Sequence, residues 1–294
     1  MTRIGLNCAL SSAFREDGSM DLSRMVAHAQ WVLANGADGI TVFGTTGEGP
    51  SIGFADRCAV LGAMAGGGLD LRKQVVAGVF GCSEEEIVAQ CNAAYDRDCR
   101  AILLAPPFYF ADASDDALFA FFSGVFRRLG VRLRDIFLYH IPGMTRVPIS
   151  VELTQRLAKA FPGAIAGVKD SAGDWPMTAR RLAELPGLQI LVGDERHLAN
   201  AVRHGGAGSI CGLANVAPDL LRPLANEGKD DPRVHAMVNA ILDYPFMPAI
   251  KAVIAAQTND PAWRIMRAPL DALSDADAKV LSDKISAIRL QKAA

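Results

Sequence analysis

The sequence predicts a closed (β/α)₈ barrel followed by a helical extension, and two patterns carry this prediction. Short apolar runs alternate at a steady interval with longer amphipathic segments, and each run is followed by Gly, Pro, Ser or Thr. Near-continuous apolar strands separated by helices are typical of a parallel sheet covered on both faces. Eight such units without a change of pattern favour closure over an open doubly wound sheet, the structural alternative. The expected strands span 3–9, 38–43, 74–80, 100–105, 135–140, 164–169, 188–192 and 207–212.

Helix-start signals fit this frame. Asp21, Ser83 and Ser150 each stand where a side-chain oxygen can accept a hydrogen bond from the first turn of the helix that follows. The eighth unit closes near Leu224, and residues 228–294 are helical in pattern with no clear strand. We therefore expect a barrel over residues 1–227 and a C-terminal helical extension over residues 228–294 that packs against it.

Composition and charge narrow the classes of function. Half of the 294 residues are hydrophobic, and thirty basic against thirty-two acidic residues give a net charge of −2 with no basic block. We therefore expect neither nucleic acid nor an anionic membrane surface as a partner. No apolar run reaches the ~18 residues of a membrane span, and the N-terminus lacks the apolar region of a signal peptide. Six scattered cysteines without a Cys-x-x-Cys pair suit a reducing cytoplasm better than a disulfide framework or a zinc site.

Three polar segments directly follow predicted strands, where barrels gather their functional side chains. In the run Gly-Thr-Thr-Gly-Glu-Gly at 44–49, the amides and hydroxyls of Thr45 and Thr46 can grip a carboxylate or phosphate. Tyr139 ends the strand 135–140, and its phenol can pass protons. Lys169 ends the strand 164–169, and burial can turn its amine into a nucleophile.

The functional prediction rests on the joint placement of these residues. Each alone has an ordinary structural explanation: a Gly-rich turn, a tyrosine packed at the rim, a lysine that reaches to water. Lys169, however, follows Tyr139 by thirty residues, one βαβ period, so both should lie at equivalent ends of neighbouring strands, ~5 Å apart. A phenol and an amine so placed can share a proton, as imine formation requires. His140 and Asp170, one residue further on, should face the opposite way.

These segments together resemble the dihydrodipicolinate synthase / N-acetylneuraminate lyase family of class I, Schiff-base-forming aldolases. The resemblance covers almost the whole chain. It implies that Lys169 forms an imine with the keto carbon of pyruvate or another 2-keto acid, and that Tyr139 shuttles protons. The matching runs are Gly-Thr-Thr-Gly-Glu at 44–48, Tyr-x-x-Pro at 139–142, Gly-Val-Lys-Asp-Ser at 167–171, Gly193-Asp194-Glu195 and Gly208-Ser209-Ile210.

The resemblance also implies roles for the surrounding residues and for the assembly. Thr45 would extend the proton relay, and Tyr109 would reach it across a subunit interface in a homo-oligomer, a dimer or tetramer. The chemistry needs no metal or organic cofactor, since the protonated imine is the electron sink. The residues expected to hold or line the substrate are Thr46, Gly47, Gly193 and Ile210.

One departure from the family pattern bears on the substrate. Members that condense pyruvate with aspartate semialdehyde carry Arg two residues after the Pro of the Tyr-x-x-Pro run, whereas this chain has Met144 there, followed by Thr145. A thioether cannot pair with a second carboxylate, and Arg146 could do so only if the loop bends differently. An apolar residue followed by a hydroxyl is closer to the sugar-acid lyases of the family, and we expect Met144 and Thr145 to contact the substrate.

The resemblance therefore implies a cytoplasmic lyase that makes or cleaves a carbon–carbon bond of a 2-keto acid, with pyruvate and an aldehyde as the pieces. The favoured substrate is a 2-keto-3-deoxy sugar acid, in an aldolase or dehydratase reaction. Two alternatives stay open. The first is a 4-hydroxy-tetrahydrodipicolinate (dihydrodipicolinate) synthase that condenses pyruvate with aspartate semialdehyde. The second, of another class, is a non-catalytic barrel that binds a keto acid.

Overall fold

The computed structural model describes residues 2–291 and contains a closed barrel of eight parallel strands, paired in sequence order. Strand β8 pairs with β1, which excludes the open sheet. Every predicted strand is confirmed, with small shifts at the ends. The strands are β1 (Gly5–Ala9), β2 (Gly39–Val42), β3 (Val75–Val79), β4 (Ala101–Leu104), β5 (Ile136–His140), β6 (Ile165–Asp170), β7 (Gln189–Val192) and β8 (Gly208–Cys211).

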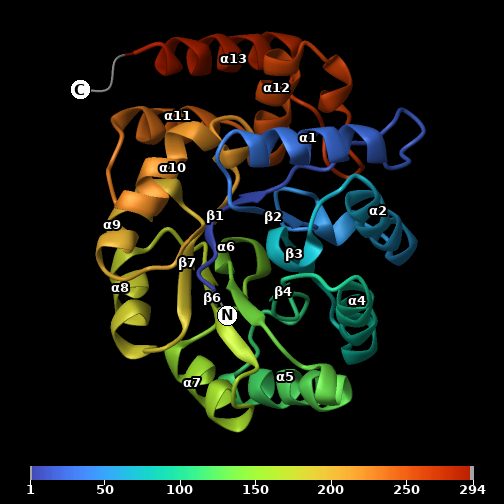
Figure 1. Cartoon of the computed structure of the whole chain (residues 1–294), viewed down its shortest axis with the longest axis vertical. Coiled ribbons are helices and arrows are strands. Elements are labelled where there is room, and N and C mark those ends of the chain that lie inside the picture. Colours follow the sequence, from blue (N-terminus) through green and yellow to red (C-terminus); the bar gives the residue numbers. More distant parts are fainter. Residues whose placement is uncertain (1, 292–294) are drawn as a thin grey trace.

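Helices surround the barrel, as Figure 1 shows. The three predicted caps are confirmed, because the side chains of Asp21, Ser83 and Ser150 accept hydrogen bonds from the amides three residues further on. The outer ring consists of α1 (Leu22–Ala34), α2 (Phe54–Gly66), α4 (Glu84–Asp96), α5 (Asp115–Leu129), α7 (Val151–Ala160), α8 (Trp175–Glu184), α9 (Leu198–Arg203) and α10 (Pro218–Glu227). Two short helices, α3 (Leu71–Gln74) and α6 (Pro142–Thr145), lie in the connections.

The predicted helical extension is confirmed, while the exact division at residue 227 stays a prediction. It contains α11 (Pro232–Leu242), α12 (Phe246–Thr258), the 3₁₀ turn η5 (Pro261–Arg264) and α13 (Asp275–Arg289). Helix α13 lies across α11 and α12, on the side of the barrel where α1 runs (Figure 1). Within residues 2–291, a search for membrane-spanning helices finds no single helix of sufficient length and hydropathy. Within these residues, only α11 and α12 taken together have the required length and hydropathy, and this pair is bent by 117°.

Two apolar clusters form the core and place the functional side chains. The larger cluster joins strands to helices and includes Leu138 and Val168. The smaller contains only residues in or beside strands, and it includes Phe137 and Tyr139. Because successive side chains of a strand point to opposite faces, Tyr139 points into the barrel. Lys169, its register partner on β6, therefore points inward too.

Barrel closure depends on two glycines that face each other. Gly5 of β1 and Gly208 of β8 are register partners, and both have a positive φ, +72° and +122°. A Cβ placed on Gly208 would lie 2.0 Å from the carbonyl oxygen of Gly5. A side chain at this position would therefore meet backbone that cannot move without opening the β1–β8 seam.

We expect Gly208→Ala to lower the free energy of unfolding by about 3 kcal/mol or more, since a positive φ and an overpacked contact each cost about 1–3 kcal/mol. Urea unfolding followed by circular dichroism measures this loss. The matched control is Gly187→Ala, because Gly187 also has a positive φ, +83°, but no atom within 4 Å of an added Cβ. An equal loss of unfolding free energy in the two variants would show that close packing at the β1–β8 seam does not contribute.

Candidate active site

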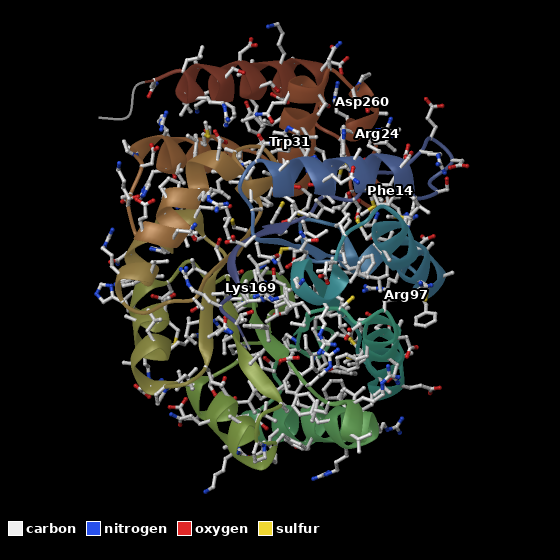
Figure 2. All side chains as sticks on the ribbon, viewed as in Figure 1. Phe14, Arg24, Trp31, Arg97, Lys169 and Asp260 are labelled. Carbon is white, nitrogen blue, oxygen red and sulfur yellow. The ribbon has the colours of Figure 1, made fainter. Side chains whose placement is uncertain are left out.

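Lys169 and Tyr139 form a buried amine–phenol pair inside the barrel. They are register partners on β6 and β5, and the Lys169 Nζ donates a hydrogen bond of 3.1 Å to the Tyr139 Oη. Their exposed fractions are 4% and 1%. Figure 2 shows Lys169 near the centre of the molecule, inside the ring of helices. The structure thus brings the two residues together as their spacing predicts.

Thr45 extends this pair into a chain of three polar groups. Its Oγ1 lies 3.1 Å from the Tyr139 Oη, and either oxygen can be the donor. The phenol therefore stands between an amine and a hydroxyl, and it can take a proton from one side while it gives a proton to the other. Such a chain suits a reaction in which a nucleophilic amine must lose and regain protons.

The turn that carries Thr45 has a strained backbone at both ends. Phe43 and Glu48, at its two ends, have φ values of 61° and 55°, in the left-handed region. Gly49 is required here, since a Cβ on it would lie 1.9 Å from the Phe43 carbonyl oxygen. Among the hydrogen bonds within residues 2–291, the backbone amides of Thr45 and Thr46 donate none. Two free amides side by side can bind a carboxylate.

A cavity of about 490 Å³ opens above the amine–phenol pair. Its wall includes Ser171, a small hydroxyl residue whose Oγ would lie 2.0 Å from a Cβ placed on Gly193. A side chain at 193 would therefore displace Ser171. The residues of the sequence prediction that line this cavity are Thr45, Thr46, Tyr139, Met144, Lys169, Gly193 and Ile210.

Three predicted site residues do not belong to the cavity wall. The Gly47 amide donates a hydrogen bond to the Gly44 carbonyl, and the Gly47 carbonyl accepts one from the Ser12 hydroxyl. The Thr145 hydroxyl lies 3.1 Å from the carbonyl oxygens of Ile141 and Val147 and can donate to either, because Pro142–Thr145 forms the helical turn α6. Tyr109 is 78% exposed. Its place across a subunit interface stays a prediction.

Two kinds of wall residue received no role from the sequence. Glu195, which belongs to the matching run 193–195, and Arg196 follow strand β7, so the strand-end rule could have assigned both to the site. Burial raises the pKa of Glu195 to about 7, and its Oε1 accepts a bond of 2.7 Å from the Leu213 amide. Arg196 forms a forked pair with Asp194, at 2.6 Å for the closest atoms. The second kind comes from the C-terminal helices, where no strand-end signal exists: Val238, Leu242, Phe246 and Met247.

His140 and Asp170 face away from the cavity, as strand alternation predicts. Asp170 forms a fully buried ion pair of 3.1 Å with Arg181 of α8, and it also accepts a bond from the Ala172 amide in the following turn. Burial and the nearby Arg181 charge lower the pKa of His140 to about 4, and its Nδ1 accepts from the Ile149 amide. These contacts fasten the ends of β5 and β6 from behind, which fixes the inward pair.

Within the described residues, no group of three or more His, Cys, Asp and Glu residues could hold a metal ion.

Comparison with known proteins gives one consistent answer. The model of the dihydrodipicolinate synthetase family matches residues 3–288. An uncharacterized DapA-like lyase of Chloroflexus aurantiacus is 31% identical over 285 residues, 94% of each chain. A 4-hydroxy-tetrahydrodipicolinate synthase of Rhizobium meliloti is 33% identical over 213 residues, 72% of this chain and 70% of the other. The crystal structure of dihydrodipicolinate synthase from Agrobacterium tumefaciens superposes with a TM-score of 0.95 at 45% identity, over 97% and 99% of the two chains.

The sequence matches thus agree with the barrel fold. A family match over nearly the whole chain leaves no large segment that would point elsewhere. The chain belongs to the dihydrodipicolinate synthetase family and is a lyase.

Proposed function

We propose that the protein is a Schiff-base lyase that makes or cleaves a carbon–carbon bond of a 2-keto acid, with pyruvate and an aldehyde as the two pieces. The observation that supports this most is the chain Lys169–Tyr139–Thr45 at the base of the cavity. Two free amides beside it supply a place for the carboxylate that every 2-keto acid carries.

The first half of the reaction forms the imine. The Lys169 amine attacks the keto carbon while the Thr45 and Thr46 amides and the Thr46 hydroxyl hold the adjacent carboxylate. Tyr139 passes one proton from the attacking nitrogen to the former keto oxygen, and a second proton, delivered from solvent through Thr45 and Tyr139, lets that oxygen leave as water. A protonated imine remains on Lys169.

The second half breaks the carbon–carbon bond. The hydroxyl on the carbon at the far end of the scissile bond gives its proton to Tyr139, the bond electrons move into the imine, and an aldehyde and an enamine result. Protonation of the enamine and hydrolysis release pyruvate and restore Lys169. In a dehydratase the imine of the intact substrate instead loses a proton from the neighbouring carbon, and the enamine so formed expels the hydroxyl on the following carbon, which leaves as water. None of these steps uses a metal or an organic cofactor, because the imine accepts the electrons.

The cavity wall favours a hydroxylated substrate chain over a second carboxylate. Met144 lines the cavity, while Arg146 is exposed and does not. The guanidinium of Arg196 does line it, but Asp194 already engages that group. A second carboxylate would therefore lack an unpaired cation. A 2-keto-3-deoxy sugar acid is the favoured substrate, and the synthase reaction named for several relatives is the alternative.

A homo-oligomer and a cytoplasmic location complete the proposal. Phe108, Tyr109 and Phe110 expose three consecutive aromatic side chains, which supports a dimer or tetramer with Tyr109 in the interface. All six cysteines are free thiols, and four of them are buried, as suits a reducing compartment.

Borohydride trapping tests the imine. With pyruvate and borohydride, we expect a stable adduct whose mass maps to the Lys169 peptide, and its loss in Lys169→Ala, together with a fall in turnover of at least about a thousandfold. Lys159→Ala, which removes an exposed lysine of α7, serves as the control and should keep the adduct. Absence of an adduct in the native protein across a range of pH would refute the Schiff-base mechanism and leave the binding barrel as the explanation.

Removal of one hydroxyl tests the proton shuttle. We expect Tyr139→Phe to lower kcat by about 10²–10³-fold and to change the affinity for pyruvate by less than about threefold, since the phenol acts on protons more than on binding. The matched control is Tyr95→Phe, because the buried Tyr95 hydroxyl bonds the Arg134 carbonyl, outside the cavity. Equal losses in kcat and affinity at Tyr139 would contradict the shuttle.

A substrate panel tests the role of Met144. We expect kcat/KM for the best 2-keto-3-deoxy sugar acid to exceed that for condensation with aspartate semialdehyde by at least about a hundredfold, the discrimination expected when a charged group lacks its partner. Comparable values would establish the synthase alternative. In that case Arg196 would have to leave Asp194 to bind the second carboxylate.

A further inference from the structure

Lys251, on α12, is a second fully buried lysine, and it reaches the turn that carries Thr45 and Thr46. Its Nζ lies 2.7 Å from the Glu48 Oε1, and neither side chain is exposed. The same Nζ donates to the Ile265 carbonyl at 2.6 Å and lies 4.6 Å from the ring centre of Phe14, which Figure 2 labels. Lys251 is not part of the cavity wall.

Glu48 joins this ion pair to the amides of the turn. Its own amide donates to the Thr45 carbonyl at 3.0 Å, and its left-handed φ of 55° needs external support. Its second carboxylate oxygen accepts from the Arg267 amide at 3.3 Å. Both oxygens of Glu48 are thus held by the C-terminal helices and the segment that follows η5. The C-terminal segment therefore fastens the end of the turn that carries Thr45 and Thr46.

The turn has a second anchor on α2, in the outer ring of helices. The buried Arg57 guanidinium of α2 donates to the carbonyls of Gly49 and Gly78, both at 2.7 Å. Helix α12 meanwhile reaches the cavity directly, because a Cβ on Gly212 would lie 2.4 Å from the Phe246 ring and 3.4 Å from the Thr46 Oγ1. The same helix that fastens the turn therefore also packs beside its substrate-facing hydroxyl.

We propose that the Glu48–Lys251 ion pair is a positioning pair through which the C-terminal helices hold the carboxylate-binding turn in its binding conformation. The proposal rests on the proposed function, in which this turn binds the substrate carboxylate. A buried ion pair adds little stability compared with apolar side chains of similar volume, but it fixes one geometry. The pair acts through the Thr45 and Thr46 amides and does not touch the substrate. Its loss should therefore weaken binding more than it slows bond breakage.

The test replaces the pair by neutral side chains of similar size, Glu48→Gln with Lys251→Met, so that no buried charge is stranded. Circular dichroism checks the fold. We expect the pyruvate concentration for half-maximal borohydride trapping to rise about tenfold or more, while the trapping rate at saturation falls less than about threefold. Lys251→Met alone, which strands Glu48, should weaken binding at least as much.

The matched control is Asp260→Asn. It breaks the Arg24–Asp260 pair of 2.7 Å, which also ties the C-terminal segment to the barrel, through α1, but does not contact the turn. Figure 2 labels both residues, well away from Lys169. We expect no change in half-saturation. A folded double variant with unchanged half-saturation, or an equal effect in Asp260→Asn, would overturn the positioning role.

A second readout separates this proposal from the proposed function. Propionate carries the carboxylate of pyruvate without its keto group, so its binding measures the turn without the imine. Ligand-observed NMR should show weaker propionate binding to the double variant than to the native protein or Asp260→Asn. If the native protein forms no adduct, the Schiff-base function fails, while this comparison still decides the role of the pair. Equal propionate binding in all three proteins would overturn it.

Discussion

The hydrogen bond between Lys169 and Tyr139 depends on the register of two neighbouring parallel strands, and the surrounding structure maintains that register. Because β5 and β6 pair with Tyr139 opposite Lys169, the amine meets a phenol inside the barrel, where both side chains are buried. One residue further along, Asp170 faces outward and pairs with Arg181, which anchors the end of β6 to α8. A slip of one residue would exchange these faces. It would turn the Lys169 amine toward the helices and bring the Asp170 carboxylate into the cavity.

The two buried lysines show how a neighbour decides what an amine can do. Lys251 lies against the Glu48 carboxylate, a full negative charge, and the carboxylate opposes the lowering of the Lys251 pKa that burial causes. Its ammonium is thereby held in an ion pair and serves structure. The partner of Lys169 is a phenol, which is uncharged in its usual state and can both accept and return a proton. The difference in chemistry therefore lies in the partner, since both side chains are buried.

Strand-end residues could be predicted from the sequence, whereas contacts between distant segments could not. Apolar runs fix which residues end a strand, and a two-residue alternation then decides which of them point inward, as for Tyr139 and Lys169. The contacts of the Thr145 hydroxyl could not be predicted in this way, because α6 turns this hydroxyl back onto the backbone of its own loop. The Glu48–Lys251 pair joins residues 203 positions apart. No local period relates two such residues, so only the packing of α12 on the barrel reveals it.

The base and the rim of the cavity come from different parts of the chain. Lys169, Tyr139 and the turn that carries Thr45 and Thr46 lie in strands or directly after them, and the Asp170–Arg181 and Glu48–Lys251 pairs hold them from behind. The outer wall instead comes from α6 and the C-terminal helices, through residues such as Met144 and Leu242, which are half exposed. Exposed positions tolerate replacement at little cost in stability. Substrate choice can therefore change at the rim without disturbing the chemistry below, as long as α12 keeps its hold on the turn.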